Sequence, residues 1–264
     1  MDNLPAPLAN AFIKGLEKYQ DSVILEFLQN SSMSVQKFKM LLLHELEMSF
    51  QLQRAFQANP SSFFAAAIHC AELRLSPSSF VGEFFFSIKN NRVHPLLGYK
   101  GVITLLQRNP QIKKIWDGVV YTEDDFEFEL GLDPKMIHVP NPKAKKETEN
   151  IRFVYVCVKI ADEIQFKLMS LDEIKEVIKT IEDPSPLYFD HIKDPQRWML
   201  KKVVLKQLAK LLPKEDTIKP AISVDDNVEG GAFLTVDENN LVKVVKPTYV
   251  TKKASIYDLV GGEE

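Results

Sequence analysis

Basic and aromatic side chains are interleaved in the middle of the sequence, between Phe84 and Thr122. The bases of this stretch are Lys89, Arg92, Lys100, Arg108, Lys113 and Lys114, and a single acid, Asp117, stands among them. Its rings are Phe84, Phe85, Phe86, Tyr99, Trp116 and Tyr121. Phosphates need positive charge, and nucleobases need flat faces on which to stack. The stretch therefore predicts a surface for a nucleic-acid strand, with stacking on Tyr99, Trp116 or Phe85; packing in the core is the alternative for each ring.

A second basic segment follows near residue 200. From Arg197 to Lys214 the chain has six bases and no acid. In a helix over about 196–212, side chains four positions apart drift by only about 40° around the axis, so the lysines form one stripe. The opposite side of this helix carries Trp198, Leu205, Leu208, Ala209 and Leu212. The segment predicts phosphate contacts from Arg197, Lys201, Lys202, Lys206 and Lys210, with a merely solvated charged face as the alternative.

Acids gather just after the first basic stretch. The cluster comprises Glu123, Asp124, Asp125, Glu127, Glu129 and Asp133, with no base among them. A two-metal nuclease site needs carboxylates that converge from several elements. Asp125, Glu127 and Glu129 instead alternate along one expected strand, so they share a face that we expect to be solvated. A metal-dependent nuclease built on residues 123–133 stays open as an alternative function.

Several kinds of chemistry lack their sequence motifs. There is no GxxxxGK[ST] and no GxGxxG, and the GYKG segment at 98–101 has the wrong spacing for a phosphate loop. The five histidines and two cysteines form no HExxH or CxxC pattern. We therefore expect no ATP-driven step, no zinc site and no catalysis. A purely structural assembly protein is the other alternative.

The net charge of −3 is unevenly distributed. Residues 215–264 contain ten acids and five bases, which leaves +2 for residues 1–214, and we expect residues 215–264 to be a flexible acidic tail. Steering of a polyanion depends on the local field more than on the total charge. No apolar run approaches the ~20 residues that span a bilayer, and the first residues lack a secretion signal. Cys70 and Cys157 lie in apolar segments and need not pair, so we expect a cytoplasmic protein.

Helix and strand patterns alternate along the chain. Helices are expected at 8–29, 34–57, 61–75, 102–108 and 196–212, and a short one after the capping box at Ser170. Hairpins are expected at 84–97, turning at Asn90 and Asn91, and at 151–169, turning at Ala161 and Asp162. Further strands are expected at 112–121 and 126–130, and an exposed loop at 134–150.

These elements predict an α+β fold. We expect a central, mostly antiparallel sheet built from hairpins, flanked by helices, with an N-terminal helical arm. The expected divisions are a helical region at 1–59, a core at 60–214 and the tail at 215–264.

Short motifs in this sequence occur in an informative order. They are Cys70-Ala71, Ser76-Pro77, Gly82-Glu83, Gly98-Tyr99-Lys100-Gly101, Gly131, His138-x-Pro140 and the lysine-rich helix that ends at Pro213. In order and spacing they resemble the RecT family of phage single-strand annealing proteins over roughly residues 60–213. This chain has Arg74 where the family usually has glycine, and an apolar strand at Phe84–Phe86. It also has Lys206 and Gln207 in place of paired arginines, which keeps one charge and loses bidentate geometry.

The resemblance implies ATP-independent annealing of complementary DNA strands in homologous recombination, by a protein that is not an enzyme. Its relatives coat single-stranded DNA as homo-oligomers, rings or filaments, and hold the annealed duplex in a basic groove. Residues 60–214 would be the annealing core, and the N-terminal helices would supply subunit contacts. No cofactor is implied, and magnesium would enter only with the nucleic acid. The implied partners are single-stranded DNA, the annealed duplex, a phage exonuclease and the host single-strand binding protein, in the cytoplasm of a bacterial host and away from any membrane.

Overall fold

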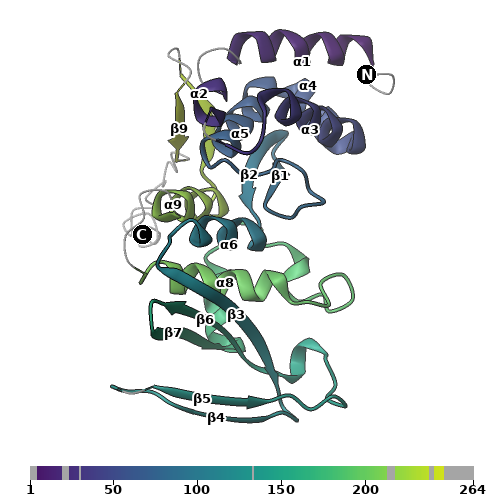
Figure 1. Ribbon diagram of the computed structural model, residues 1–264. Helices are drawn as coiled ribbons and strands as arrows, with labels where there is room; N and C mark the ends of the chain where they lie inside the picture. Colours follow the sequence, from purple (N-terminus) through teal and green to yellow (C-terminus); the bar gives the residue numbers. More distant parts are fainter. Residues whose placement is uncertain are drawn as a thin grey trace, which may run out of the picture.

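The computed structural model describes residues 5–19, 24–29, 31–132, 134–212, 218–237 and 241–246. Figure 1 shows the N-terminal helices gathered at one end of the molecule and the hairpin of β4 and β5 at the other. Between these ends lie the hairpin of β1 and β2, helices α6, α8 and α9, and the sheet that contains β3 and β6 (Figure 1). Within the described residues, no helix is both long enough and apolar enough to cross a membrane.

The N-terminal helices pack around a nearly apolar central helix. In chain order they are α1 (Ala6–Tyr19), α2 (Leu25–Leu28), α3 (Val35–Met48), α4 (Phe50–Ala58) and α5 (Pro60–Glu72). The single helix expected at 34–57 is broken, because Ser49 leaves the helical conformation and its side chain accepts the backbone N–H of Leu52. Asn59 caps α5 in the same way, with Pro60 in the first helical position.

The core continues across the division expected between residues 59 and 60. The ring centroids of Phe12 and Phe63 are 6.2 Å apart, and those of Phe56 and Phe63 are 5.3 Å apart. On the other side, Phe63 stacks on Phe86 at 5.2 Å. The N-terminal helices therefore share one apolar core with the strands that follow, and the division at residue 59 stays a prediction.

The first hairpin has the turn that its sequence predicts. It is formed by β1 (Phe84–Lys89) and β2 (Arg92–Leu97), paired antiparallel. Asn90 and Asn91 have φ values of 51° and 55°, which suits a two-residue turn of the primed type. Helix α6 (Tyr99–Gln107) follows directly and ends before Asn109-Pro110, where proline cannot continue a helix.

The second sheet has the order β3-β6-β7, all antiparallel. Its strands are β3 (Ile112–Tyr121), β6 (Ile151–Ile160) and β7 (Glu163–Ser170). Residues 154 to 158 of the middle strand are all buried, as expected for a strand covered on both faces. On one face lie α7 (Leu171–Lys179), which opens with the expected capping box, and α8 (Trp198–Ala209).

The other face of this sheet is covered by a hairpin, of which the sequence predicted the first strand but not the second. It pairs β4 (Asp125–Glu129) with β5 (Lys135–Val139), and the Phe126 and Phe128 rings lie 5.6 Å and 5.5 Å from Phe153 of β6. The loop expected at 134–150 is therefore wrong for 135–139. Met136 and His138 alternate with exposed residues there, but the neighbouring prolines and lysines hide this short period. Short 3₁₀ turns occupy Thr148–Asn150 and Pro186–Tyr188.

The α+β class and the antiparallel hairpins are confirmed. Within the described residues the strands form four separate small sheets rather than one central sheet. The fourth pairs β8 (Phe233–Val236) with β9 (Val242–Val245).

The expectation of a flexible tail from residue 215 is wrong for much of that segment. Residues 218 to 229 form α9 (Ile218–Glu229), which buries Ile218, Ala221, Ile222 and Val228. β8 then lies against α5. The acids of this segment suggest solvent exposure, but one of them, Asp225, is buried against lysines. Residues 247–264 lie outside the described part of the chain.

Candidate nucleic-acid interface

The two basic regions of the sequence meet where α6 and α8 begin. Lys100, in the first turn of α6, is exposed, and its Nζ lies 5.1 Å from the centre of the Trp198 ring at the start of α8. A cation above an indole face is attracted to the ring electrons. The segment around Lys100 therefore lies beside the start of α8.

Asp117 connects β3 to both helices. Its Oδ1 lies 2.5 Å from the Nζ of Lys201 on α8, and its other oxygen accepts a hydrogen bond from the Tyr99 hydroxyl on α6. Burial raises the pKa of Tyr99 far above its ordinary value, and the neighbouring carboxylate adds to the rise, so the hydroxyl stays a donor. The one acid of the basic stretch thus positions Tyr99 and Lys201, and both side chains are half-buried.

The glycines of the GYKG segment are needed for close packing. A Cβ at Gly98 would lie 2.2 Å from the carbonyl oxygen of Gly82, and one at Gly101 would lie 2.1 Å from that of Glu83. Only a residue without a side chain allows such an approach. The motif therefore sets α6 tightly against residues 82–83 and fixes where Lys100 emerges.

The predicted site residues fall into three groups by exposure. The exposed ones are Lys100, Arg108, Lys113, Lys114 and Lys210. The half-buried ones are Lys89, Arg92, Tyr99, Trp116 and Lys201. The buried ones are Arg197, Lys202 and Lys206.

Lys89 and Arg92 serve the first hairpin rather than the Lys100 region. Lys89 Nζ lies 2.8 Å from a carboxylate oxygen of Glu182, and the Arg92 guanidinium lies 4.4 Å from the centre of the Phe233 ring. Both residues flank the turn, at the opposite end of the hairpin from Gly98, and six strand residues span roughly 20 Å. The structure therefore places them at the far end of the hairpin from the GYKG segment and from Lys100.

Trp116 and Tyr99 lie on opposite faces of the β3 strand. Trp116 packs with Val120 and Tyr155 on the face covered by the β4–β5 hairpin, and the Nζ of Lys114 lies 5.5 Å from its ring centre. Tyr99 reaches the other face through Asp117. This arrangement therefore does not allow one strand of DNA to stack on both rings.

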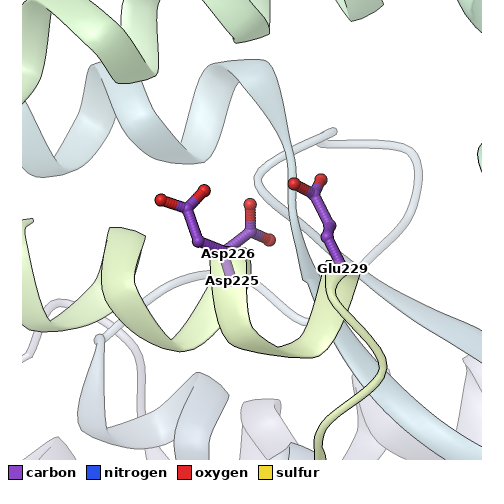
Figure 2. Close-up of side chains that lie close together, drawn as sticks. All are labelled: Asp225, Asp226 and Glu229. Carbon is purple, nitrogen blue, oxygen red and sulfur yellow. The ribbon is translucent and has the colours of Figure 1, made fainter. Parts of the chain in front are cut away.

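Helix α9 neutralises the lysine stripe of α8. Lys202 and Lys206 are only 2% and 5% exposed. Lys202 Nζ lies 3.0 Å from Asp225 and 3.0 Å from Glu229, and Lys206 Nζ lies 2.7 Å from both. Asp226 pairs with Lys206 at 2.6 Å and with the exposed Lys210 at 2.8 Å. The three carboxylates point to the same side of α9 (Figure 2).

The stripe exists, but its interpretation as an open phosphate-binding face is wrong for Lys202 and Lys206. Periodicity places them on one side of α8, yet cannot show that a partner helix covers that side. Burial alone would raise the pKa of Asp225, but the ammonium groups of Lys202 and Lys206 lower it to about 2. The same carboxylates raise the pKa of Lys206 despite its burial. These lysines and carboxylates pair across the two helices, and their first role is to hold α9 on α8.

Arg197 is also buried rather than exposed. It adopts a left-handed conformation with φ of 58° just before α8, and its Nη2 donates to the carbonyl of Lys146 at 2.9 Å. The carboxylate of Asp194 caps the helix by accepting the backbone N–H groups of Trp198 and Met199. Arg197, which was expected to bind phosphate, is therefore buried at the start of α8 instead.

The chain matches a known protein family over most of its length. The model of the RecT family matches residues 36–239. The chain belongs to the RecT family. Protein RecT of Escherichia coli K12 is 31% identical to it over 176 residues, a stretch that covers 62% of each chain. The alignment thus spans less than two thirds of that relative's length. The RecT family region also includes α9 and β8, beyond the Pro213 limit that the motifs suggested.

The described acids of the 123–133 cluster in this RecT family member do not gather into a metal site. Asp124 is buried and accepts the backbone N–H groups of Tyr121 and Asn141 at 2.7 Å and 2.8 Å, with His138 Nε2 at 3.1 Å. These two backbone donors and His138 lower its pKa, although burial opposes them. Asp125, Glu127 and Glu129 are exposed along β4 as expected, and Asp133 lies outside the described residues.

Within the described part of the chain, one group of three acids has ligand atoms close enough to share a cation. It comprises Asp225, Asp226 and Glu229, whose atoms lie within 4.8 Å of one another. Lysine ammonium groups already occupy these carboxylates, so a metal ion would have to displace them. The nuclease alternative therefore receives no support from either acidic group.

Sequence reasoning missed five residues of the surface around Lys100. Trp198 was expected on the apolar side of the helix, but it is 44% exposed beside Lys100. Phe80 and Lys193 lie beside Lys100, and Asp117 and Asp194 position its neighbours. Asp117 could have been recognised from the sequence, because a single acid within a basic stretch suggests a specific basic partner. Asp194 precedes a proline just before a helix, which is a place for a capping side chain. Phe80 and Lys193 had no comparable signal.

Proposed function

We propose that the protein anneals complementary single strands of DNA in homologous recombination without ATP. The observation that carries this proposal is the surface where α6 meets α8, with Lys100 and Trp198 exposed side by side. Positive charge next to an exposed ring suits a single strand and does not read its sequence. Family membership adds weight, since this surface contains the GYKG segment.

The cations that we assign to phosphate contact are the exposed ones. They are Lys100, Arg108, Lys113, Lys114, Lys193 and Lys210. Lys201 supports the DNA-binding surface through its ion pair with Asp117. Lys202 and Lys206 support it by holding α9 against α8. We expect no cofactor, because base pairing itself supplies the driving force for annealing.

Exposed apolar side chains on the N-terminal helices support subunit contacts. Met40 and Met48 of α3 are 64% and 65% exposed, and Phe50 of α4 is 71% exposed. Met48 ends α3 and Phe50 begins α4, so two of these exposed side chains lie close along the chain, and exposed apolar patches mark sites of association. We propose that these helices join protomers into a ring or filament on single-stranded DNA, in the cytoplasm of a bacterial host. A phage exonuclease and the host single-strand binding protein are the partners that we propose for the assembly.

Replacing Lys100 by alanine should weaken binding to single-stranded DNA equally for all sequences. The slope of log K against log salt should become shallower by roughly 0.7, since one phosphate contact is lost. Fluorescence anisotropy titrations at several salt concentrations measure this slope. Lys175→Ala on α7 is a matched control, because Lys175 is exposed and pairs with Asp172, three residues earlier on the same helix. An unchanged slope for Lys100→Ala would remove this lysine from the interface.

A further inference from the structure

A pocket with apolar walls opens beside Lys100. It has a volume of about 280 Å³ and lies between the loop before β1, the end of β2 and the starts of α6 and α8. We call it the aromatic pocket; its main walls are Phe80, Phe85, Leu96, Trp198 and Met199. Phe85 and Leu96 are cross-strand partners, so one wall is a rigid pair of the first hairpin.

The rings at the mouth of the aromatic pocket are unusually open to solvent. Phe80 is 76% exposed and Trp198 is 44% exposed. The Phe80 ring is held in place by stacking on His44, with the centroids 6.1 Å apart and the planes at 29°. Two fixed rings that face solvent around a hollow favour a flat ligand.

Two lysines lie at the rim of the aromatic pocket. Lys100 and Lys193 are both exposed there, and the Lys100 ammonium already sits over the Trp198 ring. Lys193 Nζ lies 3.5 Å from a carboxylate oxygen of Asp190, a loose surface pair that leaves its ammonium open to a phosphate. The acid in the lining, Asp194, is engaged by the backbone N–H groups at the start of α8, which compensate its charge. A ligand with a flat apolar group inside the pocket and an anionic group outside it would therefore match both the apolar walls and the lysines at the rim.

Size and chemistry together narrow the class of ligand. Pockets for drug-sized molecules run from roughly 300 to 1,000 Å³, so about 280 Å³ suits one small ring system. The lining has no asparagine or glutamine, the side chains that usually read base edges. Stacking without base reading tolerates any sequence, as strand annealing requires.

We propose that the aromatic pocket holds one nucleobase of the bound single strand in each protomer, stacked against Trp198 and Phe80. The phosphates on either side of that base then lie at Lys100 and Lys193. This inference rests on the proposed function and deepens it, because one held base per protomer fixes the register of the strand and leaves its other bases open for pairing.

The test compares the affinity of the full chain for an oligothymidylate and for an abasic phosphodiester chain of the same length. Wild-type protein should bind the oligothymidylate about tenfold more tightly, because stacking of one base contributes on that scale. Trp198→Ala should abolish most of this preference while the affinity for the abasic chain stays the same. Phe189→Ala is the matched control, since Phe189 is 38% exposed and lies outside the pocket lining, and it should keep the preference.

Phe80→Ala gives a second reading that does not depend on how α8 tolerates substitution, because the Phe80 side chain projects largely into solvent. It too should reduce the preference for oligothymidylate. If wild-type protein binds both chains equally, or if both variants keep the full preference, the nucleobase site is wrong while the annealing function stands. If wild-type protein binds neither chain, the proposed function itself fails.

Discussion

Replacing Asp225 by alanine should lower the free energy of unfolding by about 3–5 kcal/mol, the usual cost of removing one partner from a buried ion pair. Asp225 is 3% exposed and pairs with Lys202 and Lys206, and its Oδ1 also accepts the backbone N–H of Leu97 at 2.8 Å. The substitution leaves two buried ammonium groups with too few carboxylates and one buried N–H without an acceptor. Urea denaturation measures the free energy, and the midpoint of thermal unfolding should fall by roughly 10 °C.

Asp226→Ala supplies the control on the same helix. Asp226 also pairs with Lys206 and Lys210, but its side chain is 37% exposed, so its loss should cost less than about 1 kcal/mol. Equal destabilisation by the two substitutions would contradict the assignment of Asp225 as the centre of the cluster.

The lowered pKa of Asp225 also predicts how the free energy of unfolding changes in acid. Its pKa is about 2 in the folded protein, against 3.8 for an ordinary aspartate, so the folded state releases this proton more easily than the unfolded state. The stabilisation is therefore complete above pH 3.8 and is lost as the pH falls from 3.8 toward 2. It amounts to roughly 2 kcal/mol, and the stability difference between wild type and Asp225→Asn should shrink over this range. A difference that stays constant from pH 5 to pH 2.5 would contradict the lowered pKa.

Gly101→Ala should also have a large effect on the free energy of unfolding. It should destabilise the protein, although the same substitution usually stabilises a helix. Alanine ordinarily stabilises a helix by about 1 kcal/mol relative to glycine. Here the new Cβ would lie 2.1 Å from the carbonyl oxygen of Glu83. That oxygen cannot retreat easily, because it accepts the Gly98 N–H at 2.8 Å while the Glu83 side chain accepts from Ser76 and Thr104. We expect destabilisation by about 3 kcal/mol and weaker DNA binding, since Lys100 moves with α6.

Gly230→Ala tests whether this effect is specific to the GYKG segment. The nearest atom to a Cβ at Gly230 lies at 3.3 Å, so a small local adjustment accommodates it. Thermal unfolding and anisotropy measurements on both variants separate the two cases. A Gly101→Ala protein with wild-type stability would show that α6 does not pack on residues 82–83 as described.

Local signals in the sequence predicted the parts of the fold that depend on local chemistry. Paired asparagines located one hairpin turn, and the box at Ser170 located the start of α7. The apolar run from Val154 to Val158 belongs to the strand expected at the start of the second hairpin, and all five of its residues are buried. In each case the residues that determine the structure lie within a few positions of one another.

The parts that could not be predicted depend on partners far away in the sequence. Lys202 and Lys206 look like solvent-facing bases until Asp225 and Glu229, 19 to 27 residues later, are folded against them. The same acids made α9 look like part of a tail. The Lys100 side of the surface was predictable because its motif is contiguous, whereas the contact with Trp198 exists only in the tertiary structure.

The most direct test of the account is strand annealing with two complementary oligonucleotides in the absence of any nucleotide. Wild-type protein should convert them to intact duplex faster than they pair alone, and Lys100→Ala should slow this conversion in proportion to its weaker binding, while Lys175→Ala should match wild type. Magnesium-dependent loss of the DNA would indicate a nuclease, and assembly of the protein without any response to oligonucleotide would indicate a structural role; either result would contradict the assignment of the α6–α8 surface to single-stranded DNA.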